Sequence, residues 1–391
     1  MSKSSQERLG APLLDRLYYG VLCDEKRGEE QRHERDSHVL ITPPERSLWE
    51  LIALRFVERV LTEVREPIPL VGSIAFGIID RGTNVLQVRI TTVCSMCCKF
   101  CSVDAGPCSK SRWADFVVTD LEWLRAWVND VVKFKGVPVE VLLDGVGDPL
   151  EHPNVVGVVR TLKSIEGVAS VALETHGLKL NEDLAFSLAE AGLDRINLSI
   201  ETLDEAKAKE LAGRPDYDVR RVKEVIEKVF RETQVDIHVT PVLLPGINDE
   251  DIKEIIKWVK EVGFGKRWPP ITIQKYVRHK RGRKMKGIKE MTWEEFWNYV
   301  SKLEKETGAR LRWTMEEWGM MRARKLPELY KRGEVVKVEI VSRGLFRDEW
   351  LGVPVGRRDV VMTVVNADVD VGRRIKVKVR QNKDNIYLAS P

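Results

Sequence analysis

The chain has 391 residues with a formal net charge of +4, and 43% of its residues are hydrophobic and 32% charged. This composition is typical of a globular protein with an ample core, and the length suggests about two or three domains. No apolar run approaches the ~20 residues that a membrane-spanning helix needs, and the polar start of the sequence lacks the apolar core of a signal peptide. We therefore expect a cytoplasmic protein that does not bind a membrane.

Residues 1–70 are predicted to form a helical N-terminal extension. The segment Thr42-Pro43-Pro44-Glu45 is typical of a helix start, because proline is well tolerated in the first turn. Apolar residues with helical spacing follow it, namely Leu48, Leu51, Ile52, Phe56 and Val60. This spacing predicts an amphipathic helix, whereas residues 1–40 give no firm prediction.

Three cysteines stand close together in the next part of the sequence. Cys94, Cys98 and Cys101 have the spacing C-x3-C-x2-C, with Phe100 directly before the third. Three thiolates on one loop can hold three irons of a [4Fe-4S] cluster and leave the fourth iron open for chemistry. Cys97 also allows two adjacent C-x2-C pairs, but structural zinc sites separate their pairs by roughly a dozen residues. Grouped free thiols also favour a reducing compartment.

From residue 71 to residue 330, short apolar runs alternate with amphipathic stretches. The apolar runs predict strands at 86–92, 139–144, 168–174, 195–200, 235–242 and 271–277. Helical spacing occurs at 219–229 and 252–259, and Asp120 and Thr292 are placed as helix N-caps, the latter with Glu295 in a capping box. This alternation predicts an α/β domain with a parallel sheet covered by helices. Six units fit a partial, TIM-like (βα)6 barrel, and a doubly wound sheet is the alternative.

The cysteine loop follows the first predicted strand of this domain. It is therefore expected at the carboxyl edge of the sheet, where α/β proteins bind ligands. Its cysteine spacing resembles that of the radical S-adenosylmethionine (radical SAM) superfamily. In that family the methionine end of SAM chelates the open iron, and the cluster cleaves the sulfonium to give a 5′-deoxyadenosyl radical. The resemblance implies a (βα)6 core, a [4Fe-4S] cluster and SAM as cofactors, and a reductant such as ferredoxin as partner.

Further motifs that resemble this family follow the other strands, within residues 72–316. The segment 143–150 resembles the glycine-rich GGEP segment, although Val146 interrupts the glycine pair and Asp148 replaces the glutamate. The segment 174–177 resembles the TNG turn, 193–204 the segment that contacts the ribose and carboxylate of SAM, and 240–249 the PGxND turn near the adenine. Taken alone, the glycine-rich segment could equally be a strand-ending turn, and His176 a satisfied surface histidine. The resemblance implies cofactor contacts at Phe100, Gly145, Gly147, Asp148, Thr175, His176, Ser199, Glu201, Val242 and Gln274.

Residues 333–391 show strands and turns without helices. The runs 334–342, 360–365, 373–380 and 385–390 predict a small all-β barrel. In the third run, four cations share one face of the strand, and an anionic partner would relieve their repulsion. This tail resembles the TRAM domain, an RNA-binding module appended to radical SAM methylthiotransferases. The alternative is a solvated edge strand whose cations prevent aggregation.

A second basic segment follows the last predicted strand of the α/β domain, within residues 275–289. On a barrel this loop would lie at the rim of the active site, and a phosphate backbone that enters there would account for both basic segments. Few aromatic residues accompany it, so the sequence predicts no stacking platform for unpaired bases. We therefore predict that a tRNA or another structured RNA is bound through its phosphates, by Arg278, Lys280, Arg281, Arg283, Arg374, Lys376, Lys378 and Arg380.

Missing cysteines narrow the predicted reaction. Methylthiotransferases need three further cysteines upstream, where only Cys23 lies, and no cysteine follows Cys108. Hydrogen abstraction from the substrate remains, with Cys97 and Cys108 as candidate catalytic donors or extra ligands, although each could equally be a packing or surface thiol. The first hypothesis is an RNA-modifying enzyme that acts on tRNA. The alternative is a radical SAM enzyme that acts on a small metabolite or a protein side chain, with cobalamin as a further cofactor in the case of methylation. A third reading, an RNA-binding iron–sulfur scaffold, requires that SAM stays intact.

Overall fold

The computed structural model describes residues 59–391, so the predicted helix start at Thr42 lies outside the described residues. At the start of the described residues, the prediction of a helix is wrong. Strand β1 (Val60–Val64) lies there and pairs in parallel with β4 (Ala114–Val118). The helical spacing that led to Val60 is overridden by this pairing, which buries Val64 completely. Among the described residues, no helix combines the length and the hydropathy needed to cross a bilayer.

The centre of the molecule is a six-stranded sheet in the order β2-β3-β5-β6-β7-β8. Strand β2 (Gly77–Asp80) runs antiparallel to β3 (Val85–Arg89). The remaining neighbours are parallel, namely β5 (Val139–Leu143), β6 (Val168–Thr175), β7 (Arg195–Leu198) and β8 (Asp236–Val239). Strands β9 (Val242–Leu243) and β10 (Gln274–Lys275) form a separate parallel pair, joined to β8 through the Val239–Ile271 bridge. The predicted α/β class is confirmed, and the sheet is open and mixed.

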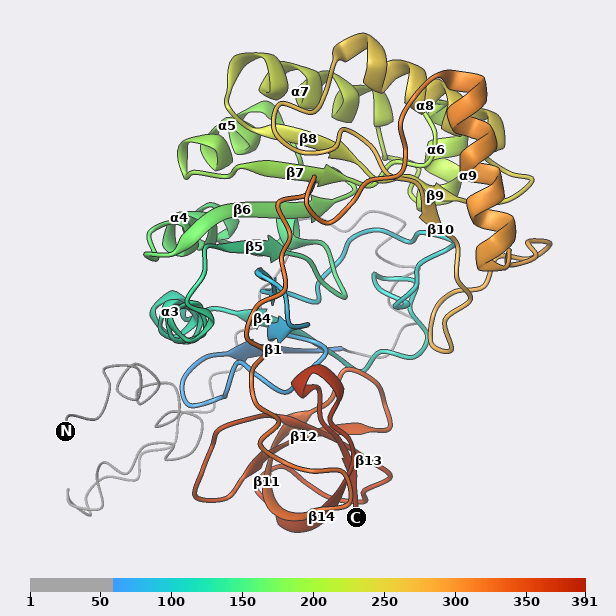
Figure 1. The fold of residues 1–391 in the computed structure, drawn as a ribbon. Coiled ribbons are helices and arrows are strands. Elements are labelled where there is room, and N and C mark those ends of the chain that lie inside the picture. The colour runs from blue at the N-terminus through green and yellow to red at the C-terminus, as the bar shows by residue number, and fades with distance from the viewer. Residues whose placement is uncertain (1–58) are drawn as a thin grey trace, which may run out of the picture.

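Seven helices accompany this sheet in the described residues, and Figure 1 shows them along its outer side. Asp120 caps the first of them by accepting a hydrogen bond from the Trp123 amide, and Thr292 and Glu295 form the predicted capping box of the last. Short 3-10 turns, η1 (Pro149–Glu151) and η2 (Lys383–Asn385), follow β5 and the C-terminal strand β14 (Arg374–Gln381). The helices are α3 (Leu121–Lys135), α4 (Val155–Lys163), α5 (Glu182–Glu190), α6 (Glu205–Ala212), α7 (Val219–Glu232), α8 (Asp249–Val262) and α9 (Trp293–Thr307).

Several strands of the central sheet carry charged residues in its interior. Arg195 on β7 pairs with Glu140 on β5 at 2.7 Å, and its guanidinium lies over the Trp318 ring. Nearer the carboxyl ends of the strands, Arg89 on β3 pairs with Asp144 at 3.3 Å. Because all of these groups are largely buried, each charged side chain needs its partner. The interior of the sheet therefore contains polar side chains up to the edge that carries the cysteine loop.

The C-terminal residues form a closed five-stranded barrel in the order β11-β12-β13-β15-β14, which confirms the predicted small β-barrel. The sequence did not reveal β12, because Gly352 and Pro354 within it are typical of turns. In β14, Val377 and Val379 are buried while Lys376 and Lys378 are exposed, as the alternation predicts. The strands are β11 (Val335–Arg343), β12 (Glu349–Pro354), β13 (Met362–Val365), β14 (Arg374–Gln381) and β15 (Leu388–Ser390).

The barrel is joined to the α/β core by backbone hydrogen bonds. The Val361 amide donates to the Val71 carbonyl at 2.8 Å, and the Tyr387 amide donates to the Gly72 carbonyl at 2.9 Å. Gly72 has φ +117°, and a Cβ at this position would lie 2.1 Å from the Val361 oxygen. Only glycine fits this contact, which holds the barrel directly against the segment before β2.

Candidate active site

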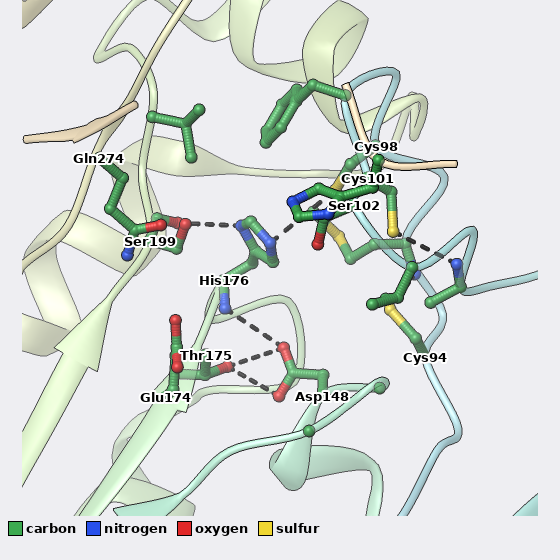
Figure 2. A pocket seen from close by; sticks show the side chains of 18 of the residues that line it. Cys94, Cys98, Cys101, Ser102, Asp148, Glu174, Thr175, His176, Ser199 and Gln274 are labelled. Atoms are coloured by element: carbon green, nitrogen blue, oxygen red, sulfur yellow. Dashed lines mark hydrogen bonds between the residues drawn. The ribbon is translucent and has the colours of Figure 1, made fainter. Parts of the chain in front are cut away.

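The three spaced cysteines line one cavity of about 260 Å³ at the carboxyl edge of the sheet. Cys94, Cys98 and Cys101 lie on the loop between β3 and β4, and Figure 2 shows them on one side of the cavity. All three are free thiols, and burial raises the pKa of Cys94 well above its usual value, with the Asp148 carboxylate adding to the effect. Metal binding would offset this cost, because a bound metal stabilises the thiolate.

The donor set fits an iron–sulfur cluster better than a single metal ion. Within residues 59–391, no three His, Cys, Asp or Glu side chains converge on one metal position. A [4Fe-4S] cluster has no such requirement, because each cysteine binds a different iron. Three soft thiolates without a fourth ligand residue therefore match a cluster with one open iron.

Buried arginines hold the cysteine loop in place, which the sequence did not predict. Arg112 donates to the carbonyl oxygens of Thr92 at 2.8 Å and Val103 at 3.2 Å, and also to Val146 of the glycine-rich segment. Arg59 donates to the carbonyl of Gly106 at 2.6 Å. These bonds satisfy carbonyls of a loop that has no regular secondary structure, so the loop is fixed without a cofactor.

The glycine-rich segment packs against the backbone of the cysteine loop. A Cβ on Gly147 would lie 2.4 Å from the Val93 oxygen, and the Asp148 amide donates to that same oxygen at 2.9 Å. Glycine is therefore required here by the loop itself, whereas the sequence suggested that a ligand required it. Gly145 and Gly147 both line the cavity, as predicted for cofactor contacts.

The turn after β6 joins Asp148 to the cysteines. Thr175 Oγ1 lies 2.9 Å from both carboxylate oxygens of Asp148, and the His176 amide lies 3.2 Å from Oδ2. The His176 ring lies between Cys98 Sγ, 4.0 Å from Nε2, and the Ser199 carbonyl, 3.0 Å from Nδ1. Burial opposes the protonated ring, but the neighbouring Cys98 thiolate and Glu201 raise the pKa of His176 well above its usual value. His176 thus lines the cavity and is not a surface histidine.

The other predicted cofactor residues lie around the same space. Phe100, Ser199, Val242 and Gln274 line the cavity, and Glu201 lines a small pocket that shares Cys98 and His176 with it. Glu201 accepts a hydrogen bond from Ser199 Oγ at 3.1 Å. The structure therefore brings together every residue that the family resemblance implied, although their contacts with SAM stay predictions.

Cys97 and Cys108 are bonded to each other as a disulfide. The expectation of free thiols at these two positions is therefore wrong for this structure. A disulfide has no S–H hydrogen to donate and no thiolate to bind iron, so neither predicted role is available while the bond is intact. The pair instead closes the segment that contains Cys98 and Cys101 into a covalent loop.

The predicted RNA-binding residues are divided among different contacts. Arg283 points inward: its side chain is 16% exposed, pairs with Asp104 at 3.0 Å and donates to the Cys98 carbonyl at 2.8 Å. Arg281 pairs with Asp348 of the barrel at 3.0 Å. These two arginines hold the basic loop on the cysteine loop and on the barrel, which makes them poor candidates for phosphate contacts. Other predicted cations are exposed, namely Arg278, Lys280, Arg374, Lys376, Lys378 and Arg380.

An aromatic pair beside the cavity was not predicted. Trp293 and Trp297, one turn apart on α9, stack with ring centroids 6.4 Å apart and are 60% and 46% exposed. Lys275, which lines the cavity, lies 5.2 Å from the Trp293 ring centroid. The sequence showed two tryptophans at helical spacing shortly after the basic segment, and this was the available signal. These exposed rings are aromatic surface that the sequence-based prediction did not take into account, and whether bases stack on them stays a prediction.

The fold and the cavity define an α/β protein with a three-thiol site at the carboxyl edge of its sheet. The model of the family described as "Radical SAM superfamily" matches residues 88–259, a range that contains all three cysteines and runs from β3 into α8. Residues 88–259 are therefore a radical SAM superfamily domain. The family implies a [4Fe-4S] cluster and SAM as cofactors, and the cavity supplies residues that suit both.

Relatives cover different shares of the chain. The uncharacterized protein MJ0103 of Methanocaldococcus jannaschii is 36% identical over 86% of this chain and 81% of that protein. The GTP 3′,8-cyclase of Chlorobaculum tepidum is 25% identical over 46% of this chain and 51% of the enzyme, so the similarity spans about half of the cyclase. The structure of Streptococcus suis SuiB bound to S-adenosylmethionine matches 59% of this chain and 51% of SuiB, with a TM-score of 0.44 and 18% identity.

Proposed function

We propose that this radical SAM enzyme modifies a nucleotide within an RNA, with tRNA as the first candidate. One observation carries the proposal: the cavity that contains the three thiols is lined by Lys275 and His279 next to an exposed tryptophan pair, and exposed lysines line the neighbouring hollow. When bound, the cluster and SAM would supply a 5′-deoxyadenosyl radical that abstracts hydrogen from the substrate. The chain's own part is to hold both cofactors and to place the substrate beside them.

The residues around the cavity suit these tasks. Cys94, Cys98 and Cys101 would bind three irons, and the free position would face the cavity that they line. Ser199 and Gln274 offer hydrogen-bonding groups across the cavity for the polar parts of SAM. Tyr276 is buried and its hydroxyl accepts a hydrogen bond from the Met285 amide at 3.2 Å, so the basic loop is held over one side of the cavity. Such enclosure limits access of water to a reactive radical.

The residues around the opening of the cavity favour a substrate that carries several negative charges and bases. Lys280, Lys284 and Lys286 are exposed and make no ion pair with any described residue. Exposed tryptophans next to cations are the combination with which proteins hold unpaired nucleotides, by stacking and by phosphate contacts. Figure 1 shows β14 on the side of the barrel away from the core, so a ligand that reached Lys376 as well would have to be large, as a folded tRNA is. The likeness of the barrel to a TRAM domain stays a prediction.

A free nucleotide is the second candidate substrate. It is favoured by the similarity to GTP 3′,8-cyclases, although the chain spans only about half of their length. A protein side chain as substrate and cobalamin as cofactor stay predictions from the sequence. Reconstituting the protein with cobalamin and measuring the absorbance of the bound cofactor would test the second of them.

The experiment has two stages. Protein reconstituted anaerobically with iron and sulfide and then reduced should convert SAM to 5′-deoxyadenosine, and Cys94→Ala, Cys98→Ala or Cys101→Ala should abolish both the cluster and this product. If SAM stays intact under these conditions, the proposal that the protein is a radical SAM enzyme is refuted. Unmodified tRNA transcript and GTP are then compared as substrates by mass spectrometry of nucleosides and nucleotides. Modification of the tRNA, with weaker and less salt-dependent binding in the Lys376→Ala/Lys378→Ala variant, supports the RNA proposal. Modification of GTP alone replaces it with the second candidate.

A further inference from the structure

One carboxyl group in the cavity has no partner. Glu174 is the last residue but one of β6 and lines the cavity. Figure 2 shows it on the side of the cavity away from the three cysteines. Its side chain makes no hydrogen bond or ion pair with any residue in the described range 59–391, although it is largely enclosed by protein. A carboxylate in such a place needs hydrogen-bond donors, and here they have to come from a ligand or from water.

The charged groups that face Glu174 already have partners. Asp144, directly after the neighbouring β5, accepts from Arg89, and also from Nε2 of the Gln87 side chain at 2.7 Å. The guanidinium of Arg89 also donates to the Ile74 carbonyl. Asp148 is occupied by Thr175 and the His176 amide. Glu174 is therefore the acidic group on this side of the cavity that is left for a ligand.

The His176 ring makes no hydrogen bond with Glu174, and its charge, like that of Arg89, only partly offsets the rise in the pKa of this carboxyl. Its two nitrogens face Cys98 and the Ser199 carbonyl. Burial, together with the charge of Asp144, raises the pKa of Glu174 to about 7. The group therefore changes from mostly protonated to mostly ionised across neutral pH, and above pH 7 it offers two acceptor oxygens and no donor.

We propose that Glu174 is a substrate-binding residue that accepts two hydrogen bonds from the paired N–H edge of a guanine-type base. This inference rests on the proposed function and deepens it, because it names the part of the nucleotide that enters the cavity. An ionised carboxylate accepts two parallel hydrogen bonds best from two adjacent N–H donors. The ring N–H and the exocyclic amine of guanine form such a pair, whereas adenine and cytosine each place an acceptor nitrogen beside their amine.

Binding should depend on pH in a defined direction. The protonated carboxyl would present a donor to a donor edge, so binding is weak below pH 7 and strengthens above it. Since the ionised fraction rises about tenfold between pH 6 and pH 8 for a pKa of about 7, the affinity should rise by about tenfold as well.

The test is calorimetric titration of the reconstituted protein, with SAM present, against guanosine 5′-monophosphate. The wild-type protein should bind it about tenfold more tightly at pH 8 than at pH 6. Inosine 5′-monophosphate, which lacks the exocyclic amine, should bind about tenfold more weakly than guanosine monophosphate at pH 8. Glu174→Gln should lose about tenfold at pH 8 and depend on pH much less than the wild type, since only the phosphate of the nucleotide and other cavity groups still titrate. Glu166→Gln, an exposed glutamate just before β6, is the matched control and should behave as wild type.

Several outcomes would overturn the inference. The inference fails if guanosine monophosphate does not bind the wild type, or if the wild type and Glu174→Gln bind it equally. It also fails if Glu174→Gln loses affinity for SAM, because the carboxyl would then be assigned to the cofactor. Competition arms distinguish the source of the base: displacement by micromolar tRNA transcript indicates RNA, and displacement by GTP alone indicates a free nucleotide. Because these titrations do not depend on turnover, they can fail while SAM cleavage succeeds, and the reverse.

Discussion

Thr175 Oγ1 lies 2.9 Å from both carboxylate oxygens of Asp148, and this contact joins the turn after β6 to the glycine-rich segment after β5. Both residues are buried, and burial raises the pKa of Asp148 in spite of the donors around it. The contact therefore fixes two walls of the cavity relative to each other, and the hydroxyl satisfies the carboxylate together with the backbone amides of Leu150 and His176.

Replacing that hydroxyl should impair the site without unfolding the protein. Thr175→Val keeps the shape of the side chain but removes the donor, at a cost of about 1.5–3 kcal/mol for a hydrogen bond to a charged group. We expect SAM affinity or the rate of 5′-deoxyadenosine formation to fall by about tenfold or more. Thr175→Ser, which retains the hydroxyl, should stay close to wild type. Equal behaviour of the two variants would show that the contact is dispensable.

Replacing Arg283 should reduce assembly of the iron–sulfur cluster and should not act through a direct contact with RNA. Its guanidinium pairs with Asp104 and donates to the Cys98 carbonyl, so Arg283→Met removes the cation that pairs with Asp104 and one donor to the Cys98 carbonyl, at a cost of roughly 3 kcal/mol. We expect the iron and sulfide content after reconstitution to fall. Lys280→Met, a neighbouring exposed cation, should keep full iron content and change only the affinity for a polyanion. Full iron in Arg283→Met would contradict the inward assignment.

The Cys97–Cys108 bond should stabilise the oxidised protein. A cross-link around a short loop restricts the unfolded chain, and for this loop the expected gain is about 2–3 kcal/mol in the free energy of unfolding. Reductant should therefore lower the unfolding free energy of the wild type but not of Cys97→Ser/Cys108→Ser, measured in urea. The double variant should still assemble the cluster, because the three ligand cysteines remain. Alkylation of Cys97 in protein isolated without reductant would argue against the bond.

His238 should make the fold sensitive to mild acid. Burial lowers the pKa of His238 to about 3, although its hydrogen bond to the Pro269 carbonyl opposes this, and Arg195 adds to the lowering. Since the unfolded chain has a histidine pKa of about 6.5, protonation favours unfolding, and stability falls as the pH drops below 6.5. Between pH 7 and pH 5.5 this residue alone should cost about 1.3 kcal/mol.

Urea unfolding at those two pH values measures this effect, with His238→Asn as the comparison. The variant is less stable overall for loss of packing, but its stability should change less between the two pH values. An equal change in both proteins would assign the acid sensitivity to other groups, such as His152, whose pKa burial also lowers.

The sequence predicted the core strands and the cavity residues because both depend on local patterns. Runs such as Val139–Leu143 are mainly apolar over the length of a strand, and the motifs follow these strands directly, so the parallel topology brings them to one edge. Strand β1 was missed because its partner, β4, is distant in sequence, and local spacing cannot report such pairing.

The destinations of long side chains could not be predicted in the same way. Arg112, Arg281 and Arg283 look alike in the sequence, yet Arg112 is buried and all three form ion pairs within the protein. Which cations remain exposed depends on how loops far apart in the sequence meet. For the same reason, the position of Glu174 beside a motif did not indicate that its carboxyl would make no hydrogen bond within residues 59–391.

The amide of Val361 and the carbonyl of Val71 belong to parts of the chain 290 positions apart, yet they form one continuous piece of backbone hydrogen bonding with Tyr387 and Gly72. Cutting the gene before residue 333 would strip these main-chain groups of their partners and leave the edge beside β2 open to aggregation. The β-barrel therefore covers one edge of the α/β domain in addition to being a folded unit. The barrel and the α/β domain should be expressed together.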